Sequence, residues 1–122
     1  MRGIRGAITV ESDDEESIWQ AGETLIAEIT QRNQLQPEDI GAIIFSMTDD
    51  LQAAFPTTGV RRLPGFDYVP LFDARQCAID GSLPKCIRAL VLADTTIPQR
   101  EIRHVYLKGA AKLRPDLAAS DD

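Results

Sequence analysis

Arginine is the residue type that this sequence supplies in excess for chemistry. Ten of its thirteen cationic side chains are arginine and three are lysine, although nineteen acidic residues give the 122-residue chain a net charge of −6. The planar guanidinium group binds carboxylates and phosphates through two parallel hydrogen bonds. Either the arginines reflect a compositional bias, or some of them form a site for a small molecule with several negative charges.

Other kinds of catalytic chemistry have little support. The sequence contains no phosphate-binding loop, dinucleotide fingerprint, nucleophile elbow or metal motif. His104 is the only histidine, and a lone histidine is more often structural or solvent-facing than catalytic. Cys77 and Cys86 have no nearby histidine to activate them. We therefore expect no nucleophilic thiol, no metal and no cofactor.

Length and composition restrict the class of protein. A chain of 122 residues forms one domain that is large enough to bury a core. Its acidic balance disfavours nucleic acid and anionic membranes as partners, and no apolar run reaches the ~18 residues of a membrane span. Because the sequence shows neither a signal-peptide core nor a disulfide framework, we expect a cytoplasmic protein.

Apolar periodicity predicts seven elements in the order strand, helix, strand, short helix, strand, helix, strand. They are a strand over 3–10, a helix over 13–32, a strand over 40–47, a short helix from Pro56, a strand over 68–78, a helix from about Pro84 and a strand over 103–108. Ser12 and Glu15 have the spacing of a capping box at the first helix. The fold class is α/β (α+β), a single domain with a mixed β-sheet and packed helices. So small a sheet leaves a face or edge that another copy of the chain would cover.

The candidate arginines lie beside predicted strand ends and turns. They are Arg5, Arg61, Arg62, Arg88 and Arg114. Arg88 falls within an apolar stretch, so we expect it to be half-buried and to need an anion. That anion is either an internal carboxylate, such as Asp73 or Asp80, or a ligand. The pattern alone does not bring these arginines together.

Segments spread over nearly the whole chain resemble, in order and in spacing, the monofunctional trimeric α/β chorismate mutases. They are residues 2–7, 9–11, 50–56, 60–61, 68–70, 85–88, 102–107 and 113–117. Each segment is weak alone, but the set is highly specific. The resemblance implies a chorismate mutase domain over 1–117 and a flexible tail over 118–122. It also implies a homotrimer whose three sheets line a barrel-like core, with active sites in clefts between neighbouring subunits.

The resemblance also implies a reaction that needs no nucleophile. The family rearranges chorismate to prephenate, which feeds the synthesis of phenylalanine and tyrosine. One C–O bond breaks while one C–C bond forms in a concerted step. The enzyme must hold a flexible dianion in its reactive shape and stabilise the negative charge that grows on the ether oxygen. A fixed cation does this without proton transfer or metal.

The same resemblance assigns the site residues. Arg88 corresponds to the cation at the ether oxygen, and Arg5 and Tyr106 correspond to groups that bind a substrate carboxylate. The remaining positions are the pocket-lining Phe55, Thr57 and Leu113 and the cations Arg61 and Arg114 at the cleft mouth, over which the tail would close.

Three positions depart from the family pattern. Gln76 replaces a glutamate that binds the substrate hydroxyl, so an acceptor remains but its charge is lost. Asp73 replaces a cysteine and either supplies the missing negative charge or faces elsewhere, and Thr58 replaces a lysine near the entrance. Positions 73 and 76 lie on opposite faces of a regular strand, so moving the carboxylate from one to the other requires a bulge or twist.

Two other functions fit the same arginines. One is a non-catalytic trimer that binds a carboxylate metabolite, and the other is an imine-deaminase-like protein, which shares the general architecture. The joint presence of Arg5, Arg88 and Tyr106 favours turnover. Loss of chorismate absorbance on adding the protein would distinguish turnover from binding alone.

Overall fold

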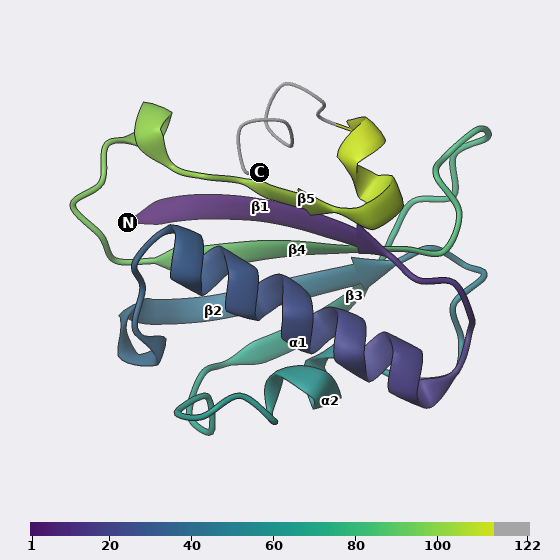
Figure 1. The fold of residues 1–122 in the computed structure, drawn as a ribbon, viewed down its shortest axis with the longest axis horizontal. Coiled ribbons are helices and arrows are strands. Elements are labelled where there is room, and N and C mark those ends of the chain that lie inside the picture. The colour runs from purple at the N-terminus through teal and green to yellow at the C-terminus, as the bar shows by residue number, and fades with distance from the viewer. Residues whose placement is uncertain (114–122) are drawn as a thin grey trace.

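A five-stranded mixed sheet forms the framework of the protein, in the strand order β3-β2-β4-β1-β5. The computed structural model describes residues 1–113, so Arg114 and the predicted tail lie outside the described residues. The strands are β1 (Arg2–Thr9), β2 (Ile40–Met47), β3 (Leu71–Arg75), β4 (Cys86–Ala93) and β5 (Val105–Leu107). The helices are α1 (Glu15–Arg32) and α2 (Pro56–Val60), with 3₁₀ turns at η1 (Pro37–Asp39), η2 (Gln99–Glu101) and η3 (Lys108–Leu113). β4 runs antiparallel to both of its neighbours, whereas the β1–β5 and β2–β3 pairs are parallel (Figure 1).

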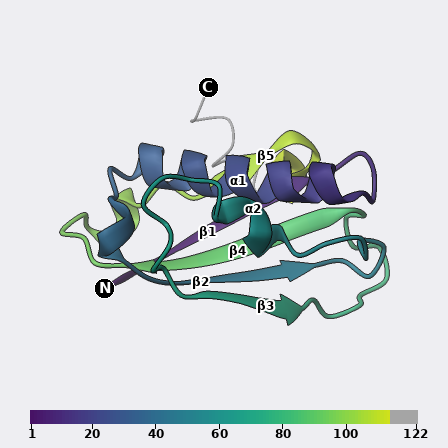
Figure 2. The same ribbon diagram turned by 90° about the horizontal axis from the view of Figure 1, so that it is seen from below.

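Both α-helices lie on one side of this sheet (Figure 2). Ile18, Leu25 and Ile29 of α1 are fully buried, and they belong to the same core cluster as Ile43 and Val91 of the central strands. Their spacing gives α1 one apolar stripe, which explains why it packs flat along the sheet. The predicted single domain with a mixed sheet and packed helices is confirmed.

The helix predicted from about Pro84 is wrong, because this stretch forms β4. Its apolar residues fit both patterns, and a short apolar run is ambiguous between a buried helix and a central strand. Here alternate residues are buried: Ile87, Ala89 and Val91 face the core, while Arg88 lies exposed between them. Pairing with β1 on one side and β2 on the other determines the outcome.

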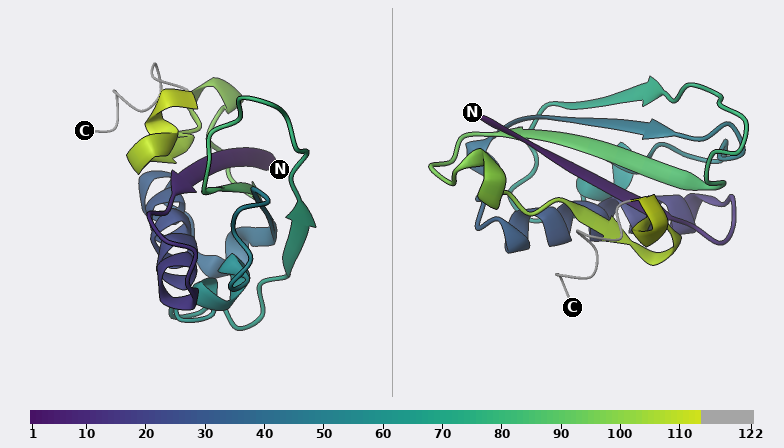
Figure 3. Two further views of the ribbon diagram at one scale, coloured as in Figure 1. Left: turned by 90° about the vertical axis from the view of Figure 1, so that its right-hand side faces the viewer. Right: turned by 90° about the horizontal axis from the view of Figure 1, so that it is seen from above.

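Several predicted boundaries also shift. The capping box of Ser12 and Glu15 is wrong, because Asp14 is the N-cap of α1 and its carboxylate accepts from the Ser17 amide at 2.8 Å. The strands predicted over 68–78 and 103–108 are shorter, at Leu71–Arg75 and Val105–Leu107. The segment that joins β3 to β4 runs round the end of the sheet (Figure 3).

Two glycines allow α2 to pack directly on the α1 backbone. A Cβ at Gly22 would lie 2.4 Å from the Pro56 carbonyl oxygen, and a Cβ at Gly59 would lie 1.8 Å from the Trp19 carbonyl oxygen. Neither position leaves room for any side chain. The contact therefore fixes α2, and with it Phe55 and Thr57, relative to α1 and the sheet.

We predict that Gly59→Ala lowers the free energy of unfolding by about 3 kcal/mol or more, the upper end for overpacking, because backbone atoms cannot rotate away. Gly41→Ala is the matched control, since its Cβ would lie 3.6 Å from the nearest atom, the Leu92 carbonyl oxygen. Thermal denaturation followed by circular dichroism measures both variants. Equal melting temperatures for the two would contradict the close contact.

Candidate active site

Strand pairing aligns one row of side chains across the face of the sheet that points away from α1. Ser46, Arg88, Ala7 and Tyr106 are direct partners on β2, β4, β1 and β5. Direct partners share a face, so the Arg88 and Tyr106 side chains lie on the same side with only Ala7 between them. Arg5 lies two residues before Ala7 and therefore faces the same side, opposite Leu90.

A cavity of about 440 Å³ lies over this row. Its lining residues are Arg5, Gly6, Ala7, Ile44, Phe45, Ser46, Arg88, Ala89, Leu90, Tyr106 and Leu113. The structure thus brings together four of the predicted site residues, namely Arg5, Arg88, Tyr106 and Leu113. Two guanidinium groups and a phenol beside apolar side chains suit a small carboxylate with an apolar body.

Arg88 is exposed, so the prediction that it is half-buried is wrong. The prediction assumed a helix, whereas strand pairing turns Arg88 away from the core. Within residues 1–113 no ion pair joins Arg88 to Asp73 or Asp80. Its guanidinium lies close to the Cys86 thiol, where burial raises the pKa of Cys86 and the Arg88 charge opposes that rise. The cation is therefore available to a ligand.

A second group of predicted residues lies around α2 and β3. Asp73 pairs with the fully buried Phe45 and so faces the helix-covered side of the sheet. The Thr57 hydroxyl donates to Asp73 Oδ2 at 2.9 Å. Phe55 is 61% exposed and lines a cavity of about 280 Å³ together with Asp73.

Of the two cations predicted at the cleft mouth and Thr58 near its entrance, the structure describes Thr58 and Arg61. Thr58 is exposed on α2. Arg61 directly follows α2, and its guanidinium donates to the Phe66 carbonyl oxygen. Arg114, predicted at the same mouth, lies outside the described residues.

Asp73 and Gln76 each hold one buried side-chain oxygen without a hydrogen-bond partner, Oδ1 and Oε1 respectively. Burial raises the pKa of the Asp73 carboxyl, and the Thr57 hydrogen bond partly opposes that rise. β3 ends at Arg75, so Gln76 lies beyond the strand. Strand alternation therefore does not force residues 73 and 76 onto opposite faces, and no bulge is needed to bring them to one side. Both oxygens need a donor that residues 1–113 do not supply.

Some lining residues were missed by the sequence interpretation. Ser46 and Leu90 line the main cavity, and Cys86 lies beside Arg88. Strand alternation would have found Cys86 and Leu90, since residues 86, 88 and 90 share one face. The misassigned helix concealed this signal.

Neither a metal site nor a membrane span is found in the described part of the chain. No group of three or more histidine, cysteine, aspartate or glutamate side chains among residues 1–113 could hold a metal ion. None of the helices in the same range is long and apolar enough to cross a bilayer.

Comparison with known proteins identifies the family. The family model for chorismate mutase type I matches residues 1–117. Chorismate mutase AroH of Bacillus subtilis (strain 168) is 46% identical over 118 residues, covering 97% of this chain and 93% of the relative. Chorismate mutase AroH of Thermus thermophilus is 47% identical over 121 residues, with 98% of each chain covered. A solved chorismate mutase from Clostridium thermocellum superposes with a TM-score of 0.89 at 37% identity, over 92% of this chain and 99% of the other. The chain therefore belongs to the chorismate mutase type I family.

Proposed function

We propose that this chain is an isomerase that rearranges chorismate to prephenate in the cytoplasm, for the synthesis of phenylalanine and tyrosine. The grouping of Arg5, Arg88 and Tyr106 over one cavity is the observation that carries the proposal. Family membership supports the same reaction. The test is loss of chorismate absorbance together with formation of prephenate. Chorismate binding without prephenate would favour a non-catalytic carboxylate-binding trimer or an imine-deaminase-like protein.

The proposed mechanism requires neither a nucleophile nor a cofactor. Arg5 and Tyr106 bind substrate carboxylates and hold the dianion in its compact reactive shape. Arg88 lies at the ether oxygen, where negative charge grows as the C–O bond lengthens. Because that charge is larger in the transition state than in bound chorismate, the guanidinium lowers the barrier rather than only tightening binding.

The active protein is proposed to be a homotrimer with each site shared between two subunits. Arg88 faces the open side of the sheet, whereas Asp73 faces the side covered by the helices. One chain therefore presents two half-sites that point in opposite directions. Ile44, Phe72 and Leu90 share the open face with Arg88, and Phe72 is 64% exposed. An apolar sheet face of this kind is stabilised when another copy covers it.

The half-site around α2 is proposed to complete the pocket of the neighbouring subunit. Phe55 and Thr57 line it beside Asp73, and Gln76 Oε1 accepts from the substrate hydroxyl. Thr58 and Arg61 lie at the mouth of this pocket. The support for this placement is the exposed ring of Phe55 beside the unpartnered oxygen of Asp73.

We predict that Arg88→Ala lowers kcat by at least ~10²–10³, the scale for removing one donor to a developing oxyanion. Arg88→Lys should recover only part of this loss, because it keeps the charge but not the planar fork. Chorismate turnover and light scattering on the same preparations check both. A folded, trimeric Arg88→Ala protein with near-normal kcat would refute the proposed role.

Mixed assemblies test the shared site. Arg88→Ala disables one half-site, and Phe55→Asp disables the other by placing a negative charge against the dianion. Each variant alone should be inactive. Co-expression at equal amounts should restore about a quarter of wild-type activity per subunit, because a quarter of randomly assembled interfaces combine two intact halves. If the co-expressed variants stay as inactive as each variant alone, both half-sites belong to the same subunit and the shared site is refuted.

We predict that Asp73→Asn stabilises the protein at neutral pH. Because burial raises the Asp73 pKa, the folded state holds this proton more tightly than the unfolded chain does. Wild-type stability is therefore lost as the pH rises from the ordinary aspartate value of about 3.9 through the raised value, and the neutral amide avoids this loss. The melting temperature of the variant minus that of the wild type should grow between pH 4 and pH 7.5.

A pH-independent difference would contradict the effect of burial on Asp73. Greater stability of the wild type at pH 7.5 would instead show that a cation, such as an arginine of a neighbouring subunit, pairs with the carboxylate. Thr57→Val, which removes the hydroxyl that bonds Asp73, is the matched control. It should raise the Asp73 pKa further, so this variant should lose more stability than the wild type as the pH rises.

A further inference from the structure

The single histidine of the chain makes a contact that the proposed mechanism does not use. His104 Nδ1 accepts a hydrogen bond from the backbone amide of Arg5 at 2.9 Å. Arg5 and His104 lie 99 residues apart in the sequence. This bond therefore joins β1, which carries Arg5, to the start of β5, which carries Tyr106, close to the main cavity.

His104 lies where backbone pairing between β1 and β5 has not yet begun. The first pair of that ladder is Gly6 with Val105, followed by Ala7 with Tyr106. One residue earlier, the Arg5 amide donates to the His104 side chain instead of to a backbone carbonyl of β5. β5 has only three residues, so few other bonds fix its position along β1.

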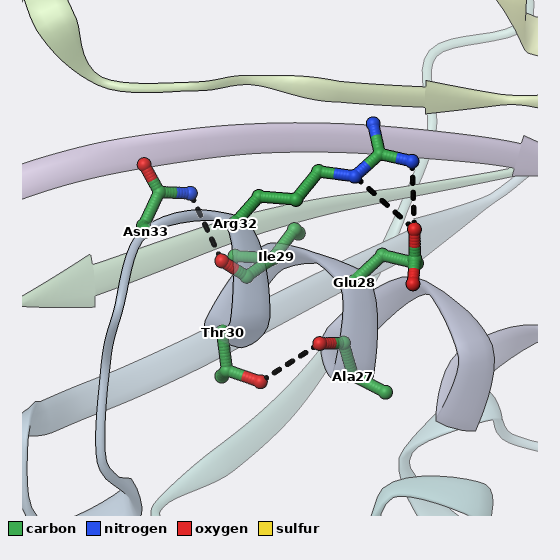
Figure 4. A network of polar contacts seen from close by, with 6 residues as sticks. All are labelled: Ala27, Glu28, Ile29, Thr30, Arg32 and Asn33. Atoms are coloured by element: carbon green, nitrogen blue, oxygen red, sulfur yellow. Dashed lines mark hydrogen bonds and ion pairs between the residues drawn. The ribbon is translucent and has the colours of Figure 1, made fainter. Parts of the chain in front are cut away.

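The residue before His104 is anchored from the other side. Asn33, at the end of α1, is 1% exposed, and its side-chain amide donates to the Ile29 and Arg103 carbonyl oxygens, both at 2.9 Å. Its Oδ1 accepts from the Arg103 amide at 2.8 Å. Figure 4 shows the Asn33 side chain turned back onto the last turn of α1. Residue 103 is thus held to the helix, and residue 104 is held to β1.

We propose that His104 is a positioning residue for substrate binding. Through Nδ1 it fixes the Arg5 backbone against the start of β5, and so sets the separation of Arg5 and Tyr106. This inference rests on the proposed function, in which those two residues bind the substrate carboxylates. The role requires an unprotonated Nδ1, so the neutral ring must carry its proton on Nε2.

The wild-type protein allows a direct test by NMR, because its only imidazole gives one set of signals. At pH 7.5, two-bond ¹H–¹⁵N correlation should show Nδ1 as the unprotonated nitrogen and Nε2 as the protonated one. A ring that carries its proton on Nδ1 would overturn the proposal, since that nitrogen could not accept from the Arg5 amide.

Three variants test whether the acceptor matters at that atom. Asparagine places Oδ1 where His104 has Nδ1, whereas glutamine places its oxygen near Nε2, and leucine has no acceptor. We expect His104→Leu and His104→Gln to raise the chorismate KM about tenfold with kcat changed less than threefold, since uniform carboxylate binding is lost. His104→Asn should keep KM within about twofold of the wild type.

The pattern across the variants separates loss of the acceptor at Nδ1 from general destabilisation, because general destabilisation would raise KM in all three. If Asn raises KM as much as Leu and Gln do, or if none of the three changes KM, the proposal is wrong. Melting temperatures show whether each variant is folded at the assay temperature. Arg5→Ala and Tyr106→Phe provide the check on the proposed function: if neither changes KM, the carboxylate roles fail, while the NMR result still reports on the His104 bond.

Discussion

The pairing of β4 on both sides is the constraint on which the site depends. β4 makes eight residue pairs with β1 and seven with β2, and its Ile87, Ala89 and Val91 face α1. A strand held in this way cannot shift without breaking two ladders of backbone hydrogen bonds. Arg88 projects from the middle of this strand, so its Cα is fixed relative to Ser46 and Ala7. The sheet thus supplies the preorganisation that electrostatic catalysis requires.

The two proposed half-sites rest on different kinds of support. Backbone pairing places Arg5, Arg88 and Tyr106, whereas α2 is fixed by the glycine contacts with α1 and by the Thr57–Asp73 hydrogen bond. Among residues 1–113, it is the one side-chain hydrogen bond that joins α2 to β3. Thr57 therefore orients the carboxyl group and also ties the helix to the edge strand.

Local sequence signals predicted the elements that depend mainly on local interactions. The apolar spacing of Ile18, Leu25 and Ile29 indicated α1, and Pro56 marked the first turn of α2. The stretch that became β4 was misassigned because its identity depends on partners about 40 and 80 residues away in the sequence. In an octamer that is apolar apart from Arg88, no local pattern distinguishes a central strand from a buried helix.

The candidate site was predicted by a different route. An excess of arginine indicated an anionic ligand, but composition could not show which arginines meet. The family resemblance named Arg5, Arg88 and Tyr106, and the structure places these three over one cavity. It could not predict the His104 bond, because a side chain that completes a backbone ladder depends on where β5 begins along β1.

An exposed Arg88 has a consequence for catalysis. In contact with water, a guanidinium stabilises a neighbouring charge weakly, because the solvent screens the interaction. The same cation acts far more strongly when a second surface excludes water from the cavity. Phe55, exposed and apolar, is a side chain of one half-site that can form such a surface. Assembly would then do more than complete the list of contacts, since it would convert the charge that β4 holds in place into an effective catalyst.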